Sequence, residues 1–316
     1  GENEVTITAT DVSGNQQTAT TSVFVRDVLG PVINSKGITL KLDGSGKASI
    51  SPSELDNGST DACGIESRLL DKRNFTCADL GENRVTLTVV DIHGNKEQAI
   101  AIVTVIDDTA PVIERKDITV DLDLNGNVTI NETELYEQVH DNCGVNSIVA
   151  SKVSFNCSNI GLNEVSITAT DESGNQSITI SKVTIRDVNG PVVTTKNVSL
   201  VLDINGSATV TAEEVDDGSV DTCEIGSLSL DKTKFNCTDI GENTVTLTVV
   251  DIYGNQSQAS ATVTVMDQSA PTIITKDVKV ELDNSGNATI TESRFYEQVI
   301  DNCDVASIRV SKRTFN

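Results

Sequence analysis

The chain has 316 residues, a formal net charge of -24 and an aromatic content of only 3%. This length suggests several domains. The few aromatic residues argue against one large core, because Phe, Tyr and Trp normally supply much of the buried area. A surface this acidic repels phosphate backbones and anionic membrane surfaces, which excludes nucleic-acid binding. No run of about 18 apolar residues occurs, so we expect no membrane insertion.

A repeat of constant length runs through the sequence without an insertion, and its clearest markers are the linker prolines Pro31, Pro111, Pro191 and Pro271. Residues 31–110 match 191–270 better than they match 111–190, so two repeat types alternate. The predicted domains are therefore a C-terminal part of a repeat at 1–30, whole repeats at 31–110, 111–190 and 191–270, and an N-terminal part of a repeat at 271–316. Both ends fall inside repeats, so we expect the natural protein to continue in both directions.

Short strands separated by turns are the expected elements of each repeat. In residues 31–110 they are, in chain order, a hairpin of 38–42 and 48–50, one helical turn after the capping-box sequence 51–54, a strand at 65–70, and a hairpin of 85–90 and 101–105. Strands that are rich in β-branched residues, with closely spaced turn signals, are typical of a small sandwich. We predict an all-β chain of tandem Ig-like antiparallel β-sandwich domains in an extended array, with one domain for each period of the repeat.

Each whole repeat has two cysteines at one constant spacing, as in Cys63 and Cys77. A structural zinc site needs four ligands, and neither His93 nor His140 has a counterpart in the other repeats. The spacing therefore favours a disulfide within each repeat, which contributes roughly 3 kcal/mol in the chain-entropy model. The predicted pairs are Cys63–Cys77, Cys143–Cys157 and Cys223–Cys237, with Cys303 unpaired. Such bonds persist in oxidising compartments, so we expect an extracellular protein.

Acidic residues recur at one end of each predicted sandwich. An aspartate ends the last strand of each repeat, shortly before the linker proline, at Asp27, Asp107, Asp187 and Asp267. In a sandwich, the last hairpin tip and an early loop lie at the end that receives this linker. For the repeat that starts at Pro111, that end gathers Asp107, Asp108, Asp141, Asp171 and Asn175.

Carboxylate and amide oxygens of this kind suit Ca²⁺. The corresponding candidates in the other repeats are Asp61, Asp221 and Asp251, and the loop of Asp56, Asn57, Ser59 and Asp61 is a weaker second candidate. The alternative is that these acids are solvated residues that cap turns, as Asp does in the hairpin motif Asp-x-x-Gly-Asn. The sequence leaves both interpretations open.

The segments 107–113, 141–145 and 171–175 are similar to the hyalin-repeat (HYR) family. Over its whole length the chain resembles the tandem HYR-like repeats of giant cell-surface adhesins of Bacteroidetes, some of which serve gliding motility. The resemblance implies an Ig-like fold and an extracellular role in adhesion. The linker 107–111 is also similar to the calcium-binding linkers of cadherins. No Cys follows the linker prolines, so the second disulfide of many hyalin repeats is not expected.

The sequence favours a protein that is not an enzyme, because no catalytic motif such as G-x-S-x-G occurs and neither histidine recurs. We predict a non-catalytic stalk or filament segment of a large secreted cell-surface adhesin, for surface attachment or gliding motility. Its expected partners are the neighbouring repeats of the same chain and an unidentified surface ligand or surface protein. The alternative is a spacer or ligand-binding array attached to a secreted hydrolase.

Overall fold

The computed structural model describes residues 1–316, and most of its elements are strands. The residues form two compact units, each of which is described by itself. Unit 1 comprises Gly1–Ile118, Asn131–Val153 and Glu164–Lys182, and unit 2 comprises Thr119–Ile130, Ser154–Asn163 and Val183–Asn316. The period of the sequence returns in the strands, since β7 (Gly81–Asp91), β15 (Gly161–Asp171) and β21 (Gly241–Asp251) occupy the same position in successive repeats. The prediction of an all-β fold with sandwich-like tandem repeats is confirmed.

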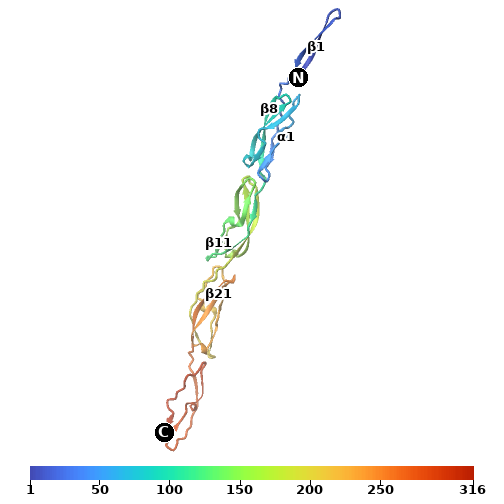
Figure 1. The fold of residues 1–316 in the computed structure, drawn as a ribbon. Coiled ribbons are helices and arrows are strands. Elements are labelled where there is room, and N and C mark those ends of the chain that lie inside the picture. Colours follow the sequence, from blue (N-terminus) through green and yellow to red (C-terminus); the bar gives the residue numbers. More distant parts are fainter. The chain divides into compact units, whose positions relative to one another are not determined.

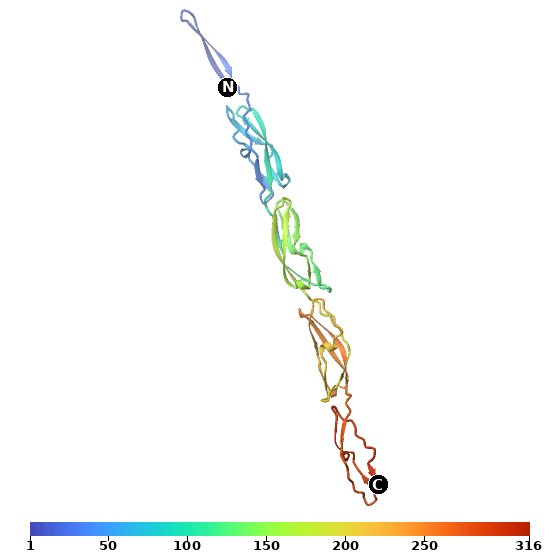
Figure 2. The same cartoon turned by 180° about the vertical axis from the view of Figure 1, so that it is seen from behind.

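Residues 31–110 lie wholly in unit 1 and form two sheets. The four-stranded sheet has the order β3 (Ile38–Lys41), β8 (Lys96–Ile106), β7 and β5 (Ile65–Leu70), and the two-stranded sheet pairs β4 (Lys47–Ser49) with β6 (Asn74–Thr76). The two long strands β7 and β8 run the length of this repeat, and β8 is labelled in Figure 1. Figure 2 shows the same strands, coloured blue to cyan, from behind.

Apolar alternation builds the core between these sheets. Val85, Leu87 and Val89 of β7 are fully buried, because every second side chain of a strand points to the same face. Phe75 of β6 is also fully buried, as is Leu55 at the end of helix α1 (Pro52–Leu55). The helical turn and its capping box, predicted at 51–54, are confirmed by the reciprocal bonds of Ser51 and Glu54. Small β-branched and aliphatic side chains thus fill a core with a single aromatic ring at its centre.

The predicted hairpin of 38–42 and 48–50 is wrong in its pairing. The turn between them forms, with a hydrogen bond of 2.8 Å from Asp43 N to Lys47 O. However, β3 runs parallel to β8, with Ile38 opposite Val103, whereas β4 pairs with β6. The turn crosses from one sheet to the other, because each strand buries its apolar side chains against a different layer. The sandwich therefore contains one parallel pair among its antiparallel strands.

The rest of unit 1 repeats parts of this pattern. The hairpin of β1 (Glu2–Thr10) and β2 (Gln16–Phe24) is dark blue in Figure 1 and carries the N-terminus. The other strands and turns with residues in this unit are β9 (Val112–Arg115), β10 (Ile118–Asp121), η2 (Glu132–Leu135), β12 (Tyr136–His140), β13 (Val145–Ala150), β15 and β16 (Gln176–Arg186), besides η1 (Cys77–Asp79). Strand β9 pairs with β12 and β13 pairs with β15, both antiparallel.

Unit 2 contains residues 191–270, whose sheets match those of 31–110. The four-stranded sheet is β17 (Val198–Val201), β22 (Gln256–Met266), β21 and β19 (Ile225–Leu230), and the two-stranded sheet is β18 (Ser207–Thr209) with β20 (Lys234–Asn236). Phe235 and Val215, the last residue of α2 (Ala212–Val215), take the core positions of Phe75 and Leu55. The equivalent positions therefore have equivalent burial.

The remaining elements of unit 2 are short. They are β11 (Asn127–Thr129), β14 (Ser154–Asn156), η3 (Cys157–Asn159), η4 (Cys237–Asp239), β23 (Thr272–Thr275), β24 (Ala288–Thr289), η5 (Glu292–Arg294), β25 (Tyr296–Ile300) and β26 (Thr314–Phe315). Strands β11 and β14, β23 and β25, and β24 and β26 form antiparallel pairs. None of the helices has the length and apolar character of a membrane span.

Candidate functional site

The disulfides join neighbouring repeats. They are Cys77–Cys143, Cys157–Cys223 and Cys237–Cys303, each with a sequence separation of 66, and their Cα atoms are 5.3, 5.3 and 5.5 Å apart. The predicted pairs Cys63–Cys77, Cys143–Cys157 and Cys223–Cys237 are therefore wrong. Cys303, predicted to be unpaired, is bonded, and Cys63 is the free and exposed cysteine.

A strand separates the two cysteines of one repeat, which explains the correction. Strand β19 lies between Cys223 and Cys237 in extended conformation. A strand of this length spans about 20 Å, whereas bonded cysteines have Cα atoms about 4.4–6.8 Å apart. The two cysteines therefore lie at opposite ends of the repeat, and each bonds to the repeat that adjoins its own end.

A glycine turn packs against each disulfide. Gly46 has φ +70°, and a Cβ atom there would lie 2.6 Å from Asn142 O and 2.7 Å from Cys77 Sγ. Asn142 also donates from Nδ2 to Asp43 O at 3.0 Å. Gly126 and Gly206 have the same φ, and a Cβ atom there would lie 2.8 Å from Cys157 Sγ and 2.7 Å from Cys237 Sγ. Only glycine combines this backbone conformation with so close an approach, so the turn of one repeat docks on a loop of the next.

Three aspartates meet beside the Cys77–Cys143 bond. Asp107 follows β8, Asp141 precedes β13 and Asp171 ends β15, and ligand atoms of all three lie within 4.8 Å of one another. Asp107 is only 7% exposed and Asp171 only 1%. Three carboxylates this close repel one another unless a cation or hydrogen-bond donors compensate them.

Asn175 holds the linker against the hairpin of this cluster. Its Nδ2 donates to Asp107 O at 3.1 Å, to Thr109 O at 3.3 Å and to Asp171 Oδ2 at 2.7 Å. Asp171 Oδ1 accepts from the backbone N–H groups of Ser173 and Asn175 at 2.9 and 2.7 Å. These bonds fix the Asp171 carboxylate and hold the linker backbone at Asp107 and Thr109 against the hairpin.

Two oxygens of the cluster are buried without a hydrogen-bond partner, Asp107 Oδ2 and Asp141 Oδ2. Asp107 Oδ1, in contrast, accepts from Thr109 N at 3.1 Å and from Asn142 Nδ2 at 3.2 Å. A buried carboxylate oxygen without a hydrogen-bond partner is costly, and a cation is one partner that would compensate it. Hard carboxylate oxygens are the ligands that Ca²⁺ prefers, and these residues fit such an ion.

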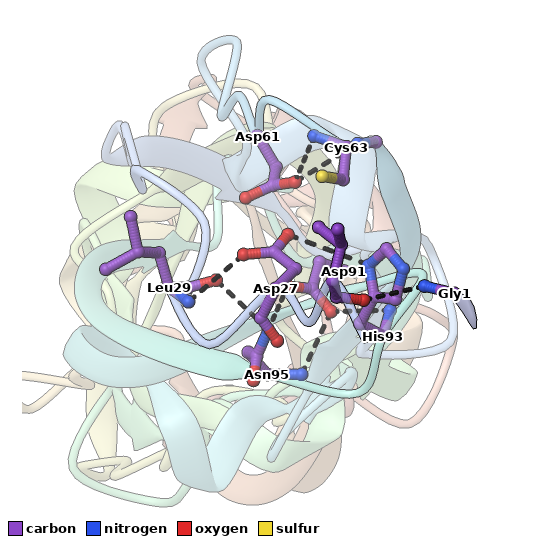
Figure 3. Close-up of polar contacts among 10 residues, drawn as sticks. Gly1, Asp27, Leu29, Asp61, Cys63, Asp91, His93 and Asn95 are labelled. Atoms are coloured by element: carbon purple, nitrogen blue, oxygen red, sulfur yellow. Dashed lines mark hydrogen bonds and ion pairs between the residues drawn. The ribbon is translucent and has the colours of Figure 1, made fainter. Parts of the chain in front are cut away.

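The same trio of aspartates recurs in both units. Asp27, Asp61 and Asp91 form it in unit 1, and Asp187, Asp221 and Asp251 form it in unit 2. Figure 3 shows the first set, in which side chains from the linker, the loop and the hairpin point toward a common space. Acidic trios therefore lie at the linker ends of the repeats that start at Pro31, Pro111 and Pro191, and these clusters could hold a metal ion.

The set around Asp27 also contains a thiol and an imidazole. Cys63, His93 and Asp27 have ligand atoms within 4.8 Å of one another, and His93 Nδ1 lies 3.6 Å from Asp27 Oδ2. The hydrogen bond of the Cys63 thiol with Asp27 raises the pKa of that thiol. Burial raises the pKa of Asp91, but hydrogen bonds from Asn95 and from His93 N outweigh it, so that pKa is lowered overall.

Several predicted ligands lie elsewhere or act differently. Asp108 is outside the cluster, where its exposed carboxylate forms an ion pair with Lys41 Nζ. Asn175 contributes amide hydrogens to the bonds described above. Asp267 accepts from Ser269 N and belongs to no trio. Asp56 of the weaker loop candidate is bound by Arg68 Nε at 2.6 Å and by Ser59, so its oxygens already have partners.

The sequence-based set missed Asp91 and Asn142. Asp91 stands one repeat before Asp171 in the same hairpin motif, so the repeat alone is enough to identify it. Asn142 has Ala62 and Thr222 at the corresponding positions and Asn302 at the third. Its role depends on the approach of the preceding repeat, for which the sequence has no local signal.

No protein-family model matches the chain, and no curated protein sequence matches it. Solved structures similar to it include PcdhgB3 EC1-4, at 13% identity and a TM-score of 0.34, covering 85% of this chain and 83% of that chain. A three-Ig segment of titin is 11% identical with a TM-score of 0.34, covering 76% and 100%. Sidekick-1 immunoglobulin domains 1–5 are 11% identical with a TM-score of 0.31, covering 83% and 66%.

Proposed function

We propose that this chain is a non-catalytic repeat segment of a large extracellular adhesin and that its repeat junctions bind Ca²⁺. The observation that carries the proposal is the trio of aspartates, which recurs three times where one predicted repeat meets the next. In one of these trios Asp107 and Asp141 each keep a buried oxygen without a partner. The domain limits 1–30, 31–110, 111–190, 191–270 and 271–316 belong to the same proposal.

In the proposed site, Asp107, Asp141 and Asp171 each supply carboxylate oxygen to one ion. Asp107 belongs to the linker, whereas Asp141 and Asp171 belong to the following repeat, so a bound ion ties the linker to that repeat. Ca²⁺ takes six to eight oxygen ligands, and water completes the shell that three side chains begin. Extracellular sites of modest charge bind Ca²⁺ with Kd values of about 0.1–1 mM, and we expect this range.

The three disulfides support the extracellular location, because such bonds persist in oxidising compartments. The formal charge of -24 supports it also, since a dissolved divalent cation offsets part of the repulsion between the repeats. The role that follows is mechanical: the repeats hold a binding region away from the cell surface, for attachment or for gliding motility. Neighbouring repeats and a surface ligand or surface protein are its partners.

The test is calorimetric titration of the chain with CaCl₂ after treatment with EDTA. We expect about three sites, and a gain of about 2 kcal/mol in unfolding free energy per site at about 10 mM Ca²⁺. Asp107→Asn removes one site from the stoichiometry. The matched control Asp108→Asn, the next position of the same linker, leaves all sites in place because Asp108 pairs with Lys41. Absence of binding heat and of stabilisation rules out the calcium role.

A further inference from the structure

We propose that the disulfides between repeats form a tension-carrying path that makes the oxidised chain nearly inextensible between Cys77 and Cys303. The repeats 111–190 and 191–270 each have one cysteine bonded to the preceding repeat and another bonded to the following one. A pull along the chain therefore has a shorter covalent route than the backbone. The inference deepens the proposed mechanical function, and its measurement depends on neither calcium nor adhesion.

The route is defined most completely in residues 191–270 of unit 2. Force enters this repeat at Cys223, through the bond from Cys157, and leaves at Cys237, through the bond to Cys303. The backbone from Cys157 to Cys237 is a whole period of the repeat, whereas the route through the disulfide uses only the short step from Cys223 to Cys237. Each disulfide therefore bypasses the backbone between its two cysteines, a sequence separation of 66.

The segment that carries the tension is already extended. Most of its residues belong to β19 and β20. Strand residues advance about 3.3 Å each, close to the limit of about 3.6 Å for a stretched chain. Strand β19 is also held by its antiparallel pairing with β21, and β20 by its pairing with β18. Little slack remains to be released when this segment is pulled.

The elements that unfold with the largest change in length lie inside the bypassed loops. Strands β21 and β22 form the long hairpin of the repeat, and both fall between Cys237 and Cys303. Their unfolding exposes core residues such as Val245 and Val263 but adds no length to the route. One unfolded repeat can therefore extend to about 50 Å when oxidised and to about 280 Å when reduced.

The test is single-molecule force spectroscopy of the full chain, held at its two ends, with and without a phosphine reductant. We expect a maximum extension of about 400 Å for the oxidised chain and about 1,100 Å for the reduced chain. The double variant Cys157→Ser with Cys223→Ser lengthens the oxidised chain by about 230 Å, because it returns one loop to the route. Cys63→Ser is the control and leaves the extension unchanged, since Cys63 has no partner in this chain.

Two results overturn the proposal. One is an oxidised extension of about 950 Å, the value expected if each disulfide closed a loop within a single repeat. The other is an unchanged extension after the double serine substitution. Removal of calcium with EDTA leaves the maximum extension as it is, because that length depends on covalent connections alone. A failure of the calcium sites is therefore distinguishable from a failure of the disulfide route.

Discussion

Unit 1 contains two acidic junctions, and the residues Gly46 and Cys77 that contact the second correspond by the repeat to positions before Gly1 at the first. At the first, Asp27, Asp61 and Asp91 meet beside the free thiol of Cys63, and at the second the corresponding trio meets beside the Cys77–Cys143 disulfide. The aspartates assemble in both. In both, the acidic cluster is built from the linker, the loop that carries Asp61 or Asp141, and the hairpin.

The asparagine that holds the linker against the hairpin, Asn95 at the first junction and Asn175 at the second, makes nearly the same bonds in both. Asn95 Nδ2 donates to Leu29 O at 3.1 Å and to Asp91 Oδ2 at 2.6 Å, and Asn175 makes the equivalent bonds at the second junction. At the second junction, Asn142 donates to Asp43 O and the Gly46 turn meets the disulfide. The acidic site thus belongs to the linker and the repeat that follows it. The contacts of the Gly46 turn, Asn142 and the Cys77–Cys143 disulfide, which join two repeats, are here called the clamp.

The largest effect is expected from removing the clamp at the second junction. The double variant Cys77→Ser with Cys143→Ser reopens a loop with a sequence separation of 66 and lowers the free energy of unfolding by about 4 kcal/mol in the chain-entropy model. Urea denaturation of oxidised protein measures the loss. The control is Cys63→Ser at the first junction, where no bond is lost. A loss equal to that of the control contradicts the pairing.

A smaller effect is expected from Gly46→Ala. The residue has φ +70°, and the added Cβ atom meets Asn142 O and Cys77 Sγ at 2.6 and 2.7 Å. We expect a loss of about 2–3 kcal/mol in unfolding free energy, since both the backbone conformation and the contact oppose the methyl group. Gly44→Ala in the same turn is the matched control, because nothing lies within 4 Å of its Cβ position. Equal melting temperatures for the two variants are incompatible with a docked turn.

The smallest effect is expected from removing the asparagines that hold the linker, and it tests whether the two junctions are alike. Asn95→Ala and Asn175→Ala each remove bonds to linker carbonyls and to an aspartate, at a cost of about 1–2 kcal/mol. Asn15→Ala in the hairpin of β1 and β2 costs less, because the Asn15 side chain bonds only Asp11 of its own turn. Thermal unfolding compares the three variants. A large difference between Asn95→Ala and Asn175→Ala breaks the equivalence of the two junctions.

Periodicity and alternation were enough to predict much of this protein. The recurring prolines located equivalent strands, and the β-branched alternation of 85–90 identified β7 and its buried face. The helical turn after Ser51 follows from a local capping pattern. The placement of Asp107, Asp141 and Asp171 at one end followed from the topology of a sandwich combined with the linker. These features depend on residues close in sequence or on one fold-level rule.

The cysteine pairing and the strand partners were decided by tertiary structure. The spacing of Cys223 and Cys237 looks local, but an extended strand carries the two residues to opposite ends of the repeat. The partner of β3 is likewise the distant strand β8, where Val103 lies opposite Ile38, instead of the strand across the turn. Distances along the sequence are poor guides where strands run straight, because each strand residue adds about 3.3 Å of separation. The sequence determined the repeat, its strands and its acidic end, whereas the packing of one repeat against the next decided which cysteines bond.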